Sequence, residues 1–183
     1  MCRDIELEQL IYQSIIKVSG QNPTTLTKTS ANPSGQKQFP LTTVGALVVN
    51  DRGQVLIVKT TKWRGTWGVP GGKVDWGETL EAALVREFQE EVGLELSQIR
   101  FALIQEAVLD SQFCKPAHFI LMNYYAFSAN ETITPNEEIV EWAWVTPQQA
   151  MSYPLNTYTQ LLIEEYLNHN IAEFYLNAIN GKD

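Results

Sequence analysis

The sequence has few cysteines, few basic residues and no long apolar run. Its two cysteines, Cys2 and Cys114, lie far apart and lack the paired spacing of zinc sites, so we expect neither a disulfide framework nor a thiolate metal site. No segment approaches 18 consecutive apolar residues, and polar residues interrupt the apolar ones near the N-terminus. We therefore expect a soluble, cytoplasmic protein with no secretory signal and no membrane partner.

Basic residues are also scarce: 13 lysines and arginines stand against 21 acidic residues, giving a formal net charge of −8. Binding to a nucleic-acid backbone needs a basic face that displaces counterions, so we do not expect a nucleic-acid polymer as a partner. Small anionic ligands are still compatible with this charge if a metal ion screens them. The composition, 44% hydrophobic and 19% charged, is typical of one globular domain.

The chain divides into three segments. Residues 1–20 place Leu7, Leu10 and Ile11 at helical intervals and predict a short amphipathic helix. Residues 21–41 contain few large apolar side chains and predict a flexible linker. Residues 42–183 form the predicted domain. The N-terminal helix has no assigned partner, and three alternatives are open: it covers a sheet edge, it forms a homodimer contact, or it has no role.

Alternating patterns and turn residues predict the elements of the domain. Strands are expected over residues 44–49 and 55–59, which form a hairpin, and over 99–109, 117–127 and 139–145. Helices are expected over 80–92, with Thr79 as the N-cap and Gly93 after its end, from Pro147, and over 158–167 and 171–179. Together these elements predict an α/β sandwich.

The helix predicted over residues 80–92 carries an unusual acidic cluster. At about 100° per residue, Glu87, Glu90 and Glu91 fall within an arc of roughly 100°, next to an apolar arc. Like charges at this spacing repel by a few tenths of a kcal/mol each, so we expect a cation among them. Clustered carboxylates suit a hard divalent ion, and Mg²⁺ is typically bound by one or two carboxylates with waters and substrate phosphates.

The residues around this cluster match a known motif. Gly72, Glu78, Arg86, Glu87, Glu90, Glu91 and Gly93 occupy the fixed positions of the Nudix box, with Phe88 and Leu94 at its apolar positions. The chain therefore resembles the Nudix hydrolases over residues 72–94, and more loosely over 42–167. The resemblance implies an α/β Nudix fold, an α/β/α sandwich with a mixed β-sheet.

The resemblance also implies a metal site. Its ligands would be the carboxylates of Glu87, Glu90 and Glu91 and the backbone carbonyl of Gly71, and its ion Mg²⁺, with Mn²⁺ as a substitute. Arg86 stands four residues before Glu90, at the spacing of an ion pair that orients a ligand. Glu78 would either hold the loop before the helix or reach a further metal ion, and both roles stay open.

The implied reaction is hydrolysis of the diphosphate bond in a nucleoside diphosphate derivative. The substrate would be a nucleotide sugar, a dinucleotide or a nucleoside triphosphate, and the products a nucleoside monophosphate and a phosphorylated remainder. The proton of the attacking water would pass to a glutamate of the box, or to Glu137 or Glu138 before the last strand. Asp110 stands where some subfamilies carry a proline or tyrosine, so the substrate class stays open.

Substrate contacts are less specific in the sequence. Arg64, Trp67 and Glu78 are the candidates for substrate binding, although strand tryptophans usually pack in a core. Other cations and aromatics near the box are weaker candidates: Lys59, Lys62, Trp63 and Tyr124. Two rival functions are a nucleotide-binding sensor without catalysis, and an isomerase of a lipid diphosphate that would need Cys114 in its pocket.

Overall fold

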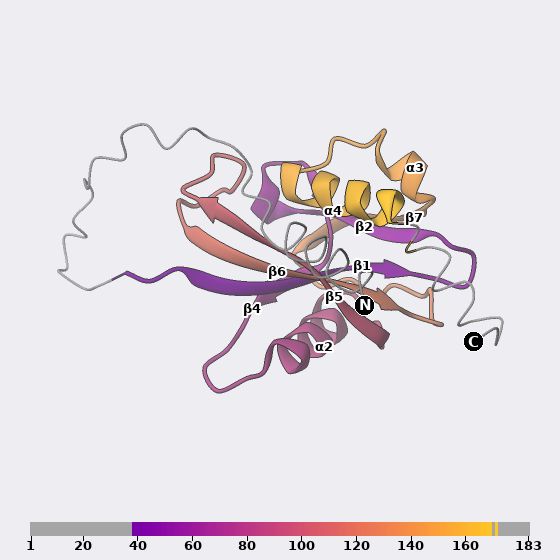
Figure 1. Cartoon of the computed structure of the whole chain (residues 1–183), viewed down its shortest axis with the longest axis horizontal. Coiled ribbons are helices and arrows are strands. Elements are labelled where there is room, and N and C mark those ends of the chain that lie inside the picture. Colours follow the sequence, from indigo (N-terminus) through magenta and orange to yellow (C-terminus); the bar gives the residue numbers. More distant parts are fainter. Residues whose placement is uncertain (1–37, 170, 172–183) are drawn as a thin grey trace, which may run out of the picture.

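A mixed sheet with helices on both of its faces organises the molecule (Figure 1). The computed structural model describes residues 38–169 and 171. The strands are β1 (Leu41–Val49), β2 (Val55–Thr60), β3 (Trp67–Gly68), β4 (Gly71–Lys73), β5 (Ser97–Val108), β6 (His118–Phe127) and β7 (Ile139–Val145). The helices are the 3-10 helix η1 (Thr61–Trp63) and the α-helices α2 (Leu80–Glu91), α3 (Pro147–Ala150) and α4 (Thr157–Asn168).

Strand β1 is the centre of the sheet. Its neighbours run β3-β2-β1-β6-β5, while β4 pairs with β1 and β7 pairs with β2. The β1–β6 pair is parallel, and the β1–β2, β1–β4, β2–β7 and β5–β6 pairs are antiparallel. The register places Gly45 of β1 opposite both Gly71 of β4 and Asn123 of β6. This crossing point brings three distant segments of the chain together.

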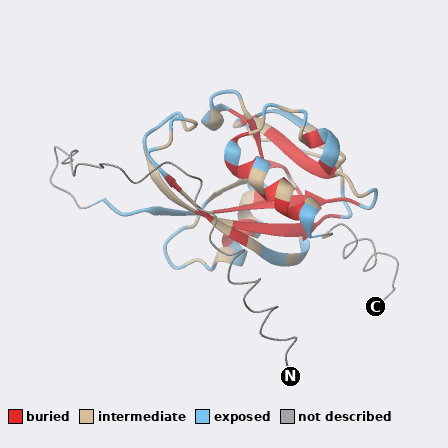
Figure 2. Cartoon of the chain, turned by 45° about the horizontal axis from the view of Figure 1, so that its top comes forward, coloured by how far each residue is buried: buried red, intermediate tan, exposed pale blue. Residues whose placement is uncertain are grey.

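Alternation along the central strands creates one core on each face of the sheet. In β1, Val44, Ala46 and Val48 pack with Leu84 and Phe88 of α2 on one face. On the other face, Leu47 and Val49 of β1 pack with side chains of α4, namely Leu162, Ile163 and Tyr166. Figure 2 shows the buried residues as a layer between the helices. The predicted α/β sandwich with a mixed sheet is confirmed.

The ends of α2 follow from local sequence. The Thr79 side chain accepts a hydrogen bond from the Ala82 N–H, as predicted for the N-cap. At the other end the Leu94 N–H donates to the Phe88 carbonyl at 3.3 Å across Gly93, whose φ of 71° favours glycine. The helix ends at Glu91, one residue earlier than predicted, and the two short strands β3 and β4 were not predicted at all.

The remaining predictions agree with the structure or lie outside it. The hairpin, the three long strands and the helices beginning near residues 147 and 158 are present within a few residues of their expected bounds. The N-terminal helix, most of the linker and nearly all of the helix expected over residues 171–179 lie outside the described residues. In the part of the chain that the structure describes, every helix is too short or too polar to cross a membrane.

Candidate active site

The acidic face of α2 borders a cleft of about 740 Å³. Glu87, Glu90 and Glu91 all line it. Leu84 and Phe88 on the adjacent side of the helix are fully buried against the sheet and fix the rotation of α2. The structure therefore has one side of α2 packed in the core and an adjacent acidic side that lines the cleft.

Arg86 is a cation that lies within this cluster. Its Nε and Nη2 atoms donate to the two carboxylate oxygens of Glu78, both at 2.9 Å, and Nη2 also donates to the Lys73 carbonyl at 3.0 Å. Its Nη1 atom donates to Glu87 at 2.8 Å and to Glu90 at 3.4 Å. All five N–H donors of the guanidinium are therefore used. The hydrogen bonds that Arg86 donates to Glu78 and Glu87 raise its pKa further above its usual value.

Glu78 holds the loop before α2. One of its oxygens accepts from the Asp75 N–H at 3.2 Å while the carboxylate forms its two bonds with Arg86. The hydrogen bonds from Arg86 lower the pKa of Glu78 below its usual range. Of the two roles open for Glu78, the structure shows the loop-holding one. The expected Arg86–Glu90 pair is present, but Glu78 and Glu87 are the closer partners of Arg86.

Glu91 lies deeper than its neighbours, with 3% of its surface exposed. One carboxylate oxygen accepts from the Gly71 N–H at 2.9 Å, and the other accepts from the Lys62 ammonium at 3.2 Å. Burial raises the pKa of Glu91, and these two contacts offset it only in part. The same Lys62 ammonium also contacts Glu138. Burial would lower the pKa of Lys62, but the hydrogen bonds and charges of Glu138 and Glu91 outweigh it and raise that pKa.

The two glycines of β4 allow this arrangement for different reasons. A Cβ on Gly71, whose φ is 149°, would lie 2.1 Å from the Val44 carbonyl oxygen of β1, so glycine is needed for the β1–β4 pairing. A Cβ on Gly72 would lie 2.3 Å from the Glu87 carboxylate. Gly71 therefore permits the strand pair, and Gly72 leaves room for an acidic side chain.

The loop before β7 brings Glu138 to the cleft. The Asn136 N–H donates to the Glu91 carbonyl at the end of α2 at 3.0 Å, and the Asn136 side chain accepts from the Glu138 N–H at 2.9 Å. Glu138 lines the cleft, whereas Glu137 is exposed and is not among the lining residues. The structure thus separates two adjacent acids that the sequence did not distinguish.

The other predicted substrate contacts lie elsewhere. Trp67 is 8% exposed and packs edge-on against Tyr153 with ring centroids 4.9 Å apart, so its ring belongs to the core beneath α4. Arg64 is exposed, and its Nε atom donates to the Phe113 carbonyl at 3.1 Å. Neither residue lines the cleft. Lys59 pairs with Glu141 at 2.7 Å, outside the cleft.

An aromatic group that the sequence did not single out lines the cleft away from α2. Its members are Trp63, Phe113, Phe119 and Tyr158, from η1, the loop after β5, β6 and α4. We call them the aromatic wall. Only Trp63 was a weak candidate from the sequence. The one feature of the sequence that could have indicated this group is Phe113, a large apolar side chain within a polar loop. Its partners lie up to 50 residues away in the sequence, so the group as a whole could not be predicted. Cys114 of the same loop also lines the cleft and is exposed.

Metal binding can be judged from the donor set. Among residues 38–169 and 171, no three His, Cys, Asp or Glu side chains are already gathered in the arrangement of a metal centre. The oxygens of Glu87 and Glu90 are instead shared with Arg86, and those of Glu91 with Gly71 and Lys62. The donors are nevertheless hard oxygens on one wall of one cleft, which fits Mg²⁺ or Mn²⁺ once these side chains turn from their present partners.

Comparison with known proteins agrees with this geometry. A family model described as a NUDIX domain matches residues 40–166. The nucleoside triphosphatase NudI of Escherichia fergusonii is 36% identical over 129 residues, covering 65% of this chain and 91% of that protein. NudI of Escherichia coli K12 is 33% identical over the same length and coverage.

Solved structures show the same architecture. The MutT NUDIX hydrolase from Burkholderia pseudomallei has a TM-score of 0.61 and 28% identity, covering 70% of this chain and 98% of that one. The NUDIX domain of Shewanella oneidensis NrtR, solved with ADP ribose, has a TM-score of 0.62 and 22% identity, covering 75% and 92% of the two chains. The second likeness is one of fold alone.

Proposed function

Since this chain belongs to the Nudix family and is a Nudix hydrolase, we propose that it hydrolyses nucleoside triphosphates with the help of Mg²⁺, releasing a nucleoside monophosphate and pyrophosphate. The observation that carries the proposal is one cleft with an acidic end on α2 and an aromatic end on η1 and the loop after β5. Phosphates suit the first end and a base suits the second. Relatives at 33–36% identity that are named nucleoside triphosphatases support this choice over nucleotide sugars and dinucleotides.

Mg²⁺, or Mn²⁺ in its place, would be held by Glu87, Glu90, Glu91 and the Gly71 carbonyl. When bound, such an ion neutralises phosphate charge and lowers the pKa of a bound water molecule toward neutral pH. Arg86 keeps the Glu87 and Glu90 carboxylates oriented through its Nη1 bonds while its other side is fixed on Glu78. Because Glu78 anchors Arg86 to the loop, Arg86 can release one acid without losing its position.

Glu138 is the acid that we propose as the acceptor of the water proton. It lines the cleft, faces Lys62, and is held by the Asn136 side chain. The water oxygen forms a bond to phosphorus, the anhydride P–O bond breaks, and the leaving phosphate group takes the electron pair. The proton passes to the Glu138 carboxylate, and the Lys62 ammonium stabilises the negative charge of that carboxylate before transfer.

A panel of nucleoside triphosphates, nucleotide sugars and dinucleotides, incubated with Mg²⁺ and assayed for phosphate products, tests the proposal. We expect turnover of nucleoside triphosphates, a loss of about 100-fold or more in kcat for Glu138→Gln, and little change for the adjacent exposed control Glu137→Gln. Binding of nucleotides without any product from the panel would instead identify a sensor. Equal effects of the two substitutions on kcat would contradict the proposal that Glu138 accepts the water proton.

A further inference from the structure

Two cations lie among the carboxylates of the cleft, and they are held in different ways. The Arg86 guanidinium uses all five of its N–H donors, and its paired bonds to Glu78 fix it to the loop before α2. The Lys62 ammonium has two acidic partners, Glu91 and Glu138, and its side chain is 44% exposed. An ammonium on a flexible four-carbon stem rotates away from a partner more easily than a planar guanidinium held on several sides. Of the two cations, Lys62 is therefore the one that can move.

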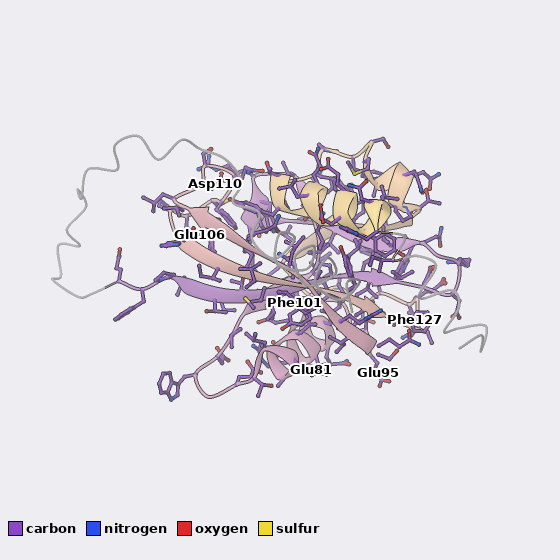
Figure 3. All side chains as sticks on the ribbon, viewed as in Figure 1. Glu81, Glu95, Phe101, Glu106, Asp110 and Phe127 are labelled. Carbon is purple, nitrogen blue, oxygen red and sulfur yellow. The ribbon has the colours of Figure 1, made fainter. Side chains whose placement is uncertain are left out.

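The backbone beside this ammonium is fixed. The Lys62 carbonyl accepts from the Cys114 N–H at 3.1 Å. Cys114 belongs to the loop after β5, near whose start Figure 3 labels Asp110. The preceding residue, Thr61, donates its N–H to the Glu138 carbonyl at 3.4 Å. Motion of Lys62 is thus limited to its side chain, and its ammonium stays within reach of Glu138.

The two carboxylate oxygens of Glu91 are not equally available to a cation. Oε2 accepts from the Gly71 N–H at 2.9 Å, beside the β1–β4 pair that Gly71 makes possible. Oε1 accepts from the Lys62 ammonium at 3.2 Å. Glu91 is 3% exposed, so a rotation that offered Oε2 instead would leave the buried Gly71 N–H without its acceptor. A cation that reaches Glu91 from the cleft therefore meets Oε1, where the Lys62 ammonium lies.

Charge opposes two cations at this oxygen. Like charges a few ångströms apart repel more strongly beside buried groups than in water. A buried carboxylate that loses its only cation is also strongly destabilising, so Glu91 needs one cation at Oε1. Lys62 has a second acid in the same cleft, Glu138, and can give up Glu91 while it keeps that contact. An exchange of one cation for another at Glu91 is therefore possible without leaving either charge unpaired.

We propose that Lys62 and the divalent ion compete for Oε1 of Glu91, and that Lys62 pairs with Glu138 alone once it gives up Glu91. This inference rests on the proposed function, which assigns Glu91 to the ion and the water proton to Glu138. Lys62 is a positioning residue, because it acts on the reaction through these two acids. The competition makes the cleft bind the ion less tightly than its carboxylates alone would.

Calorimetric titration of Mn²⁺ into the full-length protein, without nucleotide, tests the competition. Lys62→Met keeps an unbranched side chain but removes the charge, so it should bind Mn²⁺ about 10-fold more tightly than the wild-type protein, the low end of what a hydrogen bond to a charged group contributes. Lys62→Arg keeps a positive charge and should not show this gain. The titrations are run at about pH 8, well above the usual pKa of a glutamate, so that the carboxylates are ionised.

Lys59→Met is the matched control for the loss of one positive charge. Lys59 lies near the end of β2, and its ammonium pairs with Glu141 at 2.7 Å, outside the cleft. Both substitutions change the net charge by the same amount, so a general electrostatic effect would appear in both. We expect Lys59→Met to bind Mn²⁺ with an affinity within about twofold of wild type, because exposed ion pairs contribute little.

Thermal unfolding supplies a second measurement. In buffer with a chelator, Lys62→Met should melt at a lower temperature than the wild-type protein, because Glu91 loses its cation while it stays buried. Added Mn²⁺ should then raise the melting temperature of Lys62→Met more than that of the wild-type protein, because tighter binding gives more stabilisation. A residue that only supported the fold would show the first effect without the second. Lys62→Gln, which has no charge but can still donate to Glu91, replaces Lys62→Met if that variant does not fold.

Two results separate the inference from its premise. If none of these proteins takes up Mn²⁺, with or without nucleotide, the metal site and the proposed function fail, and the competition fails with them. If the wild-type protein takes up Mn²⁺ but Lys62→Met binds it no more tightly, or Lys59→Met gains as much affinity, the proposed function stands and the competition is wrong.

Discussion

The two ends of the cleft are built in opposite ways. The acidic end is formed mainly by one helix and the loop before it, within residues 71–91, and its side chains are already bonded to one another through Arg86 and Lys62. The aromatic end gathers four rings from residues 63, 113, 119 and 158. The first end holds more carboxylates than cations and so stays negatively charged, while the second is mainly apolar. The residues of the acidic end therefore lie close together in the sequence, whereas those of the aromatic end lie far apart.

The largest effect is expected where the acidic end meets the substrate. Glu90 lines the cleft, and its side chain is 59% exposed. Glu90→Gln keeps the shape but removes the charge, so the melting temperature should change little while kcat falls by more than about 100-fold, beyond the usual effect of removing a metal's outer partners. Steady-state assays and thermal unfolding measure both. Retained turnover would remove Glu90 from the site.

A smaller loss is expected for the residue that orients the acids. Arg86→Lys keeps one positive charge but cannot reproduce five donors in a planar fork. We expect a loss of about 10- to 100-fold in activity, with a weaker affinity for Mn²⁺ by calorimetry. Unchanged Mn²⁺ affinity together with unchanged kcat would mean that Arg86 serves only the fold of the loop.

The glycines of β4 give a matched pair. The three atoms nearest to a Cβ on Gly72 all belong to the movable Glu87 carboxylate, so Gly72→Ala should lower activity about 10-fold while stability changes by less than about 1 kcal/mol. Gly71→Ala meets the Val44 carbonyl at a positive φ and should lower the free energy of unfolding by about 1–3 kcal/mol. Denaturant unfolding beside activity assays distinguishes them, and an equal loss of stability in both would contradict the separate roles.

The smallest effect is expected for Cys114. Its thiol lies in the cleft lining and donates to the Thr61 carbonyl at 3.1 Å, a contact that a serine hydroxyl can also make. The Cys114→Ser variant should therefore hydrolyse nucleotides at a rate within about twofold of wild type. This corresponds to a change in activation free energy well below the 1.4 kcal/mol of a tenfold effect. A loss of activity that depends on the thiol would favour the chemistry of an isomerase at the aromatic end.

These two ends also show what the sequence could predict. The spacing of Glu87, Glu90 and Glu91 placed them on one side of a helix, and the structure has them there because helical geometry is local. The role of Glu78 was ambiguous, because a glutamate at this position can either hold the loop before α2 or reach a further metal ion. Lys62 was a weak candidate for phosphate binding because lone cations usually face solvent. Its contact with Glu91 joins residues 29 positions apart, so the spacing could not predict it.

Tertiary packing decided the positions that the sequence could not. Trp67 was a substrate candidate, yet the pairing of β3 with β2 turns its ring into the core beneath α4. Phe113 lies in a loop with no periodic pattern, so its place in the wall depends on contacts with η1 and α4. The hydrogen bond between the Gln105 and Asn123 side chains crosses from β5 to β6 and required the strand register. Such contacts cannot be predicted from the local spacing of residues in the sequence.

Divalent-ion binding is the most direct test of the account. Calorimetric titration of Mn²⁺ into the full-length protein with a slowly hydrolysed nucleoside triphosphate analogue should show uptake of the ion. The same titration into Glu87→Gln/Glu90→Gln protein should show uptake weakened at least about 10-fold. Equal uptake by both proteins, or none by the wild-type protein, would contradict the claim that the acidic wall of α2 is where the substrate phosphates are bound and cleaved.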